Sequence, residues 1–193
     1  MKITLPDGVF SSNFIFFNNS DKPMLKKMFK LWVQLCRQSL KIGSTRIINF
    51  PEGLSEAIFC IEAGARVARS TDPIPGTSSS FDCFDFNNSE RIQLKAASSY
   101  GPSSFGPRSE YDRIFFLFMR DIAKSANHIA RNFSGYYEIY ELNPSAIPLI
   151  NVNKTTTLAG QQQKNLRPRF IIPSKIIEPY KIKPIYIGNI DNW

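Results

Sequence analysis

A chain of 193 residues is long enough to bury a hydrophobic core, and its 42% hydrophobic content is typical of a globular protein rather than a disordered one. Its 24 lysines and arginines against 16 acidic residues give a formal charge of +8, which favours an anionic partner such as nucleic acid. Because no apolar run is long enough to cross a membrane and the N-terminus is a poor signal peptide, we expect a cytoplasmic protein without membrane contact.

The cysteine and histidine residues exclude several kinds of site. Cys36, Cys60 and Cys83 are widely spaced among apolar neighbours, which predicts buried free thiols rather than disulfides or a zinc site. The single histidine, His128, has no metal-binding or nucleophile pattern beside it. Hydrolases built on a Ser–His or Cys–His pair are therefore not expected.

The first predicted helix follows residues 1–19, whose role the sequence does not indicate. It begins near Ser20 and Asp21 and ends by Gly43. Its apolar residues recur at helical spacing, namely Met24, Leu25, Met28, Leu31, Trp32, Leu35 and Leu40. The opposite face carries Lys26, Lys27, Lys30 and Arg37. This basic face has three possible roles: it is exposed to solvent without a partner, it contacts phosphates, or it forms a dimer surface.

A second helix is predicted to open at Asn49 and Pro51. We expect five apolar side chains to pack it against a sheet, namely Leu54, Ile58, Phe59, Ile61 and Val67. Glu52 and Glu56 are four residues apart and so share one helical face. A loop over residues 70–77 then leads into a hairpin.

Residues 79–96 have the pattern of a β-hairpin. Both arms have strand-type composition, and Asn87 and Asn88 suit a two-residue turn because asparagine tolerates positive φ. This turn places Phe84 opposite Arg91, which fixes the register of the two strands.

The same register gathers three polar side chains on one face. Asp82 lies opposite Gln93, and Lys95 follows two residues later on the same side of the strand. A carboxylate and an amide oxygen suit Mg²⁺, which often bridges a protein to a substrate phosphate. The hairpin therefore predicts a cation site with an amine beside it.

The remaining chain completes a mixed α/β domain. Residues 96–107 are a loop beside the site, and residues 114–119 and 136–142 are strands that raise the sheet to at least four. Residues 151–193 form a C-terminal part of the same single domain, with a DNA-reading loop and short edge strands. Its amide and guanidinium groups are of the kinds that read base edges. They are Gln162, Gln163, Arg167 and Arg169, with Lys164 among them.

The chain resembles small type II restriction endonucleases of the PD-(D/E)XK superfamily, from about Phe50 to the C-terminal region. Four segments carry the resemblance: residues 78–85, 91–96, 104–110 and 167–170. The similarity extends to the subgroup that reads short GC-rich sites of the GCNGC kind. Two positions depart from the signature, because Ser80-Phe81 replaces its proline and Gln93 replaces its second acid, which puts a second metal ion in doubt.

The resemblance implies a Mg²⁺-dependent, sequence-specific endonuclease that cuts duplex DNA, acts as a homodimer and has a cognate DNA methyltransferase. It also makes Glu56 the acid that the preceding helix lends to the site, with Glu52 as the alternative. From charge and position, Asp82 anchors the metal, with the Gln93 side-chain oxygen and the Leu94 carbonyl as further ligands. Lys95 orients or deprotonates the attacking water.

We expect DNA contacts from the tail and from the loop after the hairpin, where Ser104 and Arg108 could bind phosphates. Two alternatives remain open. One is a noncatalytic DNA-binding protein, which would hold duplex DNA with or without magnesium. The other is a resolvase with the same core, whose substrate would be a branched junction.

Overall fold

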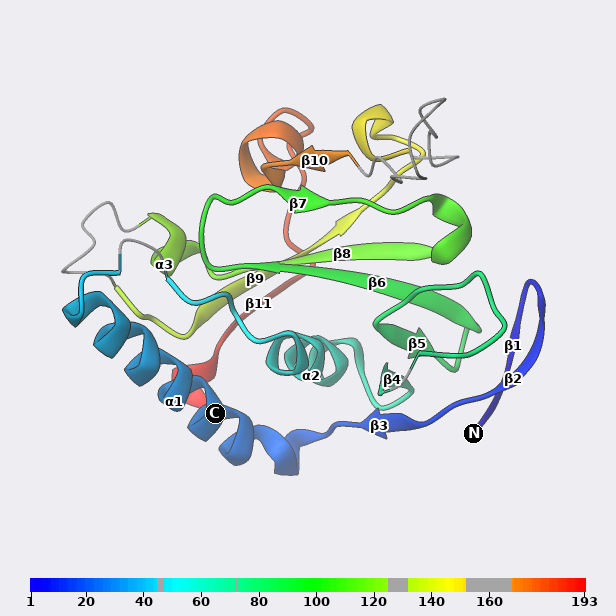
Figure 1. Cartoon of the computed structure of the whole chain (residues 1–193), viewed down its shortest axis with the longest axis horizontal. Helices are drawn as coiled ribbons and strands as arrows, with labels where there is room; N and C mark the ends of the chain where they lie inside the picture. Colours follow the sequence, from blue (N-terminus) through cyan, green and yellow to red (C-terminus); the bar gives the residue numbers. More distant parts are fainter. Residues whose placement is uncertain (45–46, 72, 125–131, 152–167) are drawn as a thin grey trace.

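A mixed β-sheet forms the centre of the protein (Figure 1). The computed structural model describes residues 1–44, 47–71, 73–124, 132–151 and 168–193. Among them the largest sheet has seven strands in the order β11-β9-β8-β6-β5-β4-β3, and all neighbours are antiparallel except β6 and β8. Its strands are β3 (Phe14–Phe16), β4 (Val67–Ser70), β5 (Cys83–Asp85), β6 (Glu90–Ala97), β8 (Arg113–Phe118), β9 (Tyr136–Leu142) and β11 (Tyr186–Asn189). The predicted mixed α/β fold with a sheet of at least four strands is confirmed.

Two helices cover one face of this sheet, as Figure 1 shows. They are α1 (Lys22–Lys41) and α2 (Glu52–Ala63), and α2 packs between α1 and the strands. Side chains of β8 alternate between two cores, so that Phe115 and Leu117 pack on the helical side while Phe116 packs on the other. The second core is closed by the C-terminal helical turn Pro173–Ile177. Strand β8 is therefore buried on both faces, which explains its continuous apolar run.

The buried face of α1 differs from the predicted one. Leu25 and Trp32 point into the core as expected, together with Phe29, Val33 and Cys36. The prediction was wrong for four apolar residues that lie on the solvent side, namely Met24, Met28, Leu31 and Leu35. Helical spacing identifies apolar stripes, but it does not say which stripe faces the core.

The predicted hairpin register is confirmed, since Phe84 pairs with Arg91. The strands are shorter than expected, because β5 ends at Asp85 and residues 86–89 form the turn. The Asp85 carboxylate accepts hydrogen bonds at 2.8 Å from the Asn87 N–H and the Asn88 side-chain amide, which holds the turn closed.

Several elements were not predicted. Residues 1–19 contain the hairpin β1 (Lys2–Leu5) and β2 (Gly8–Ser11) as well as β3. Val67 begins β4 instead of extending the second helix, and Gly64 ends α2 with a φ of 104°. The loop after the hairpin contains β7 (Ser103–Ser104), which pairs with β10 (Arg169–Phe170).

The C-terminal part was predicted as short edge strands. One edge strand, β11, is present, but Pro173 starts a helical turn rather than a strand. Short helical elements complete the structure: α3 (Arg120–Lys124) and the 3-10 turns Asn19–Asp21, Arg108–Glu110, Pro148–Ile150 and Ile190–Asn192.

All three cysteines are buried free thiols, as predicted. None of the described helices combines the length and the apolar character that a bilayer crossing requires.

Candidate active site

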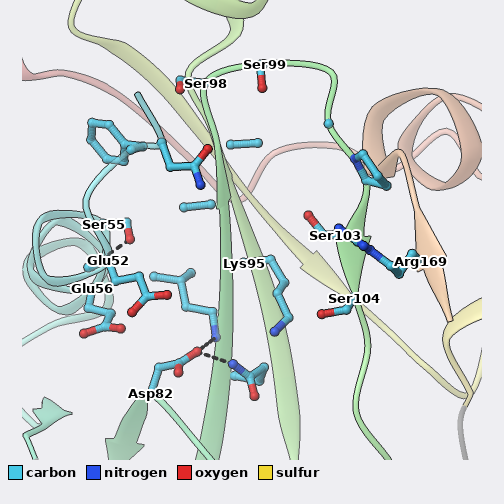
Figure 2. Close-up of a pocket in the computed structure, with 18 residues that line it drawn as sticks. Glu52, Ser55, Glu56, Asp82, Lys95, Ser98, Ser99, Ser103, Ser104 and Arg169 are labelled. Carbon is cyan, nitrogen blue, oxygen red and sulfur yellow. Dashed lines mark hydrogen bonds between the residues drawn. The ribbon is translucent and has the colours of Figure 1, made fainter. Parts of the chain in front are cut away.

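A polar cleft of about 410 Å³ lies beside β6 (Figure 2). Strand β5 pairs with β6 only as far as Ile92, so the edge of β6 beyond this residue faces the cleft. The start of α2 forms one wall, and β7 with β10 forms the other. Its labelled lining residues in Figure 2 are Glu52, Ser55, Glu56, Asp82, Lys95, Ser98, Ser99, Ser103, Ser104 and Arg169.

Asp82 sits at the point where β5 begins. Its N–H donates to the Ile92 carbonyl at 2.9 Å, and its Oδ2 accepts from the Leu94 N–H at 2.7 Å and from the Gln93 side-chain amide. The predicted convergence of Asp82, Gln93 and Lys95 is therefore present in the cleft. Burial raises the pKa of Asp82 and the Glu52 charge adds to this, while the Leu94 N–H, the Lys95 charge and the Gln93 amide partly offset both.

Backbone and amide oxygens complement this carboxylate. Gln93 donates its amide N–H to Asp82, which leaves its side-chain oxygen to accept from another group. The N–H and C=O of one strand residue point to the same edge, so the Leu94 carbonyl points to the side on which Asp82 lies. A carboxylate, an amide oxygen and a main-chain carbonyl are thus available along the edge of β6 that β5 leaves unpaired.

Two further carboxylates come from α2. Glu52 and Glu56 both line the cleft, and Glu56 is only 8% exposed. Burial raises the pKa of Glu56, the hydrogen bond and charge of Arg69 lower it, and the charges of Asp82 and Glu52 raise it again. The net effect is a raised pKa, because burial together with the two neighbouring carboxylates outweighs the ion pair with Arg69.

A second cavity of about 480 Å³ lies on the other side of the carboxylates. It shares Glu52, Glu56 and Asp82 with the cleft and adds Arg69 of β4, together with hydroxyl groups of the loop before β5. The three carboxylates therefore form a wall between two polar cavities. Among the described residues, acidic, histidine and cysteine side chains alone do not form a group of three that could hold a metal ion.

The predicted DNA-contacting residues fall into three places. Ser104 and Arg169 lie in the cleft, and they are register partners in the β7–β10 pair. Arg108 does not line the cleft, and its guanidinium donates to the Ser145 hydroxyl at 2.9 Å. The remaining four predicted residues, Gln162, Gln163, Lys164 and Arg167, lie outside the described residues.

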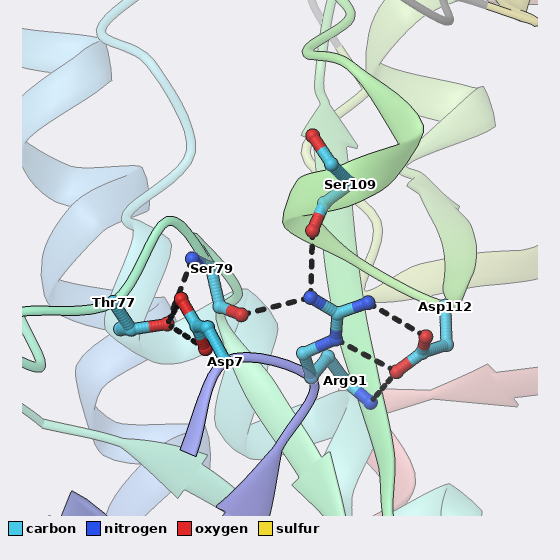
Figure 3. Close-up of polar contacts among 6 residues, drawn as sticks. All are labelled: Asp7, Thr77, Ser79, Arg91, Ser109 and Asp112. Carbon is cyan, nitrogen blue, oxygen red and sulfur yellow. Dashed lines mark hydrogen bonds and ion pairs between the residues drawn. The ribbon is translucent and has the colours of Figure 1, made fainter.

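Arg91 of β6 joins the loops next to the site, a role that was not predicted (Figure 3). It is 5% exposed and forms a bidentate pair with Asp112, with N–O distances of 2.9 and 2.8 Å. The same guanidinium donates to the Ser79 hydroxyl at 2.8 Å and to the Ser109 carbonyl at 2.7 Å. It thus ties the loops before β5 and β8 to the strand that carries Gln93. An arginine two residues before Gln93 was the only sequence signal for this role.

The N-terminal hairpin is joined to the same loop. The Asp7 carboxylate accepts from the Ser78 N–H at 2.7 Å and from the Thr77 hydroxyl at 2.7 Å, and Figure 3 shows the contact with Thr77. These bonds lower the pKa of Asp7. The segment that precedes Asp82 is therefore held from both sides, by Asp7 and by Arg91.

Comparison with known proteins links this chain to one family. The family model described as Bsp6I restriction endonuclease matches residues 17–179, which include α2, the hairpin and β10. The type II restriction enzyme Bsp6I of Bacillus sp. (strain RFL6) is 30% identical over 161 residues, which cover 82% of each chain. No solved structure matches the chain significantly.

Proposed function

Because the chain belongs to the Bsp6I restriction endonuclease family, we propose that it is a type II restriction enzyme that hydrolyses phosphodiester bonds of duplex DNA at a defined sequence. The observation that carries this proposal is the meeting of Asp82, Gln93 and Lys95 at the open edge of β6. The carboxylates of Glu52 and Glu56 stand beside them in the same cleft. We propose a short GC-rich target, such as GCNGC, from the resemblance of the hairpin and its flanks.

The residues of the cleft fit a magnesium ion. Asp82, the Gln93 oxygen and the Leu94 carbonyl are hard oxygen ligands of the kind that Mg²⁺ prefers. Burial, with a smaller effect of neighbouring carboxylates, raises the pKa values of Asp82 and Glu56, so the charged form of both groups is disfavoured in the metal-free cleft. A cation would favour the charged form, and Glu56 is placed to act as a further ligand or to bind its water.

When bound, Mg²⁺ supplies polarisation of the phosphate and a water of lowered pKa. Lys95 orients the attacking water, accepts or relays its proton and offsets the charge that develops on the phosphate in the transition state. Asp82 and Gln93 would hold the Mg²⁺ ion next to Lys95, because their oxygens cannot bind an anionic phosphate directly. Arg69 holds the Glu56 carboxylate in place through their ion pair.

The opposite wall of the cleft is proposed to read the DNA. Arg169 enters from β10, and a guanidinium fork pairs with N7 and O6 of guanine. Ser104 on the neighbouring strand is suited to a phosphate. Arg167, Gln162, Gln163 and Lys164 remain proposed contacts, Gln162 and Gln163 to base edges, and the net charge of +8 supports an anionic substrate.

One cleft cuts one strand, so we propose a twofold dimer whose symmetry matches a palindromic target. A cell that makes such an enzyme must protect its own sites, which implies a cognate DNA methyltransferase. The whole described chain is proposed to act as one nuclease domain.

A digest of mixed plasmid DNA tests the proposal. With Mg²⁺, the protein should give discrete fragments whose sequenced ends share one short motif, and with EDTA it should give none. Lys95→Ala is the matched control, since it removes the amine and leaves the rest of the cleft.

Two results would overturn this function. Binding of duplex DNA without cleavage under any divalent metal indicates a noncatalytic binder. Cleavage confined to four-way junctions, with intact linear duplex, indicates a resolvase.

A further inference from the structure

The outer surface of α1 carries an apolar stripe. It is defined by five residues, whose exposed fractions are 51% for Met24, 42% for Met28, 55% for Leu31, 56% for Leu35 and 87% for Ile42, which follows the helix. Gln38 occupies the gap between the last two. These six positions follow one another at spacings of four, three, four, three and four residues.

The four intervals within the helix, from Met24 to Gln38, average 3.5 residues, which is the period of a seam between two packed helices. The core-facing residues of α1, such as Phe29 and Trp32, form a separate stripe beside it. From Met24 to Leu35 the outer stripe runs for roughly 17 Å along the helix axis. An isolated exposed leucine needs no explanation, whereas a continuous seam on a water-soluble surface marks an interaction site.

We propose that this stripe is the surface through which a second copy of the chain binds, with α1 of one subunit packed against α1 of the other about a twofold axis. The inference rests on the proposed function, since duplex cleavage calls for two clefts. A twofold axis makes one stripe complementary to itself, because each residue meets the same stripe in the partner. In an antiparallel crossing, Met28 packs on Leu31 of the partner subunit, and Lys27 lies beside Gln34 of the partner subunit.

The charges of α1 permit this pairing, although the helix is basic. Lys26 donates to a main-chain oxygen of Trp193 at 3.0 Å, and the Lys22 ammonium lies 5.3 Å from the centre of the Trp193 ring. The Arg37 guanidinium lies 5.6 Å from the centre of the Phe133 ring. These three basic residues are thus turned toward their own subunit, whereas Lys27 and Lys30 are exposed.

The exposed surface of the stripe can also be compared with the area that a dimer interface needs. The stripe exposes roughly 500 Å² of surface per subunit, which is comparable to the largest apolar patch of a typical monomer. A standard interface buries about 800 Å² per partner, and the polar residues that flank the stripe supply the remainder. Figure 1 shows α1 on the far side of α2 from β7, so a partner on α1 leaves the cleft open to DNA.

The test is sedimentation velocity of the full chain without DNA over a range of protein concentrations. The variants are Leu31→Lys and Leu35→Lys, and Val9→Lys is the matched control because Val9 is 67% exposed and lies on β2. We expect a wild-type dimer whose dissociation constant rises about 100-fold in each seam variant, because symmetry removes two buried leucines at about tenfold each. Val9→Lys should match the wild type, and circular dichroism should show all variants folded, as expected for exposed positions.

The inference is overturned by a wild-type chain that stays monomeric, including one that binds anionic vesicles instead. It is also overturned by a dimer that survives both seam substitutions or that dissociates on Ile187→Lys at the sheet edge, where Ile187 is 60% exposed. A supercoiled plasmid separates this inference from the proposed function: the wild type should linearise it with Mg²⁺ and Leu31→Lys should mainly nick it. A dimer that depends on Leu31 but cuts no DNA refutes the nuclease and leaves the interface standing.

Discussion

Replacing Asp82 with asparagine should make the metal-free protein more stable while abolishing cleavage. Asparagine keeps the shape of the side chain, and its oxygen can still accept from the Leu94 N–H and the Gln93 amide. What disappears is a negative charge whose pKa is raised by burial and by Glu52, against the opposing effects of Leu94, Lys95 and Gln93. The charged form is therefore less favourable in the folded protein than in water.

Two opposing effects set the magnitude. Each hydrogen bond loses about 1 kcal/mol when its acceptor becomes neutral. Removing the buried charge stabilises the folded protein by more than the two weakened hydrogen bonds destabilise it, because the pKa of Asp82 is raised despite both hydrogen bonds. We expect the free energy of unfolding to rise by on the order of 1 kcal/mol, or Tm by about 2–4 °C for a chain of this size.

The assay is unfolding followed by circular dichroism at neutral pH, first with EDTA and then with Mg²⁺. Magnesium at about 100 times its Kd should stabilise the wild type by about 2.7 kcal/mol and leave Asp82→Asn unchanged. Cleavage by the variant should fall at least about 1,000-fold. Asp85→Asn is the control, since Asp85 closes the neighbouring turn but does not line the cleft.

The control should lose some stability and keep both its response to Mg²⁺ and its cleavage. An Asp82→Asn protein that is less stable than the wild type in EDTA would refute the reasoning about buried charge. One that gains the full stabilisation from Mg²⁺ would remove Asp82 from the metal site.

Three further predictions concern other parts of the site. Lys95→Ala should reduce cleavage about 100- to 10,000-fold and leave specific DNA binding intact in a gel-shift assay, whereas near wild-type cleavage would exclude Lys95 from the chemistry. Arg169→Ala should weaken binding to the cognate site by about 1–3 kcal/mol in excess of its effect on random DNA, whereas an equal loss on both with a shallower salt dependence would assign Arg169 to a phosphate. Asp112→Asn should lower the free energy of unfolding at neutral pH by about 1 kcal/mol, because Asp112 is partly exposed and solvent screens its pair with Arg91. Burial acts to raise the pKa of Asp112, but the hydrogen bonds and charge of Arg91 outweigh it and lower that pKa, so this stability is present above the usual carboxyl pKa and is lost as pH falls through the folded-state value. A difference between wild type and Asp112→Asn that persists in acid would contradict this assignment.

The hairpin was predictable because its determinants are local. Turn residues and alternation fix the pairing of Phe84 with Arg91, and this pairing brings Asp82 and Gln93 together without further information. The helix that carries Glu56 was also predictable, since its apolar spacing and the Pro51 before its first residue are local, although no side chain caps its start. The mixed sheet followed from the number of strand-like segments.

Features that depend on contacts between distant parts of the chain could not be predicted from the sequence. Helical spacing does not distinguish the core-facing stripe of α1 from the stripe that contains Leu31, because the choice depends on where α2 and the sheet lie. The ion pair of Glu56 with Arg69 joins α2 to β4, and the pairing of Ser104 with Arg169 spans 65 residues of sequence. The open edge of β6 follows from where β5 starts, which alternation alone does not give.

The two walls of the cleft come from parts of the chain that are synthesised at different times. The carboxylates and Lys95 leave the ribosome before Arg169, and the opposite wall exists only after β10 has paired with β7. An incomplete nascent chain thus contains the proposed hydrolytic groups without the wall proposed to hold duplex DNA against them. A cell that makes this nuclease is exposed to its full activity only once the last part of the chain has docked.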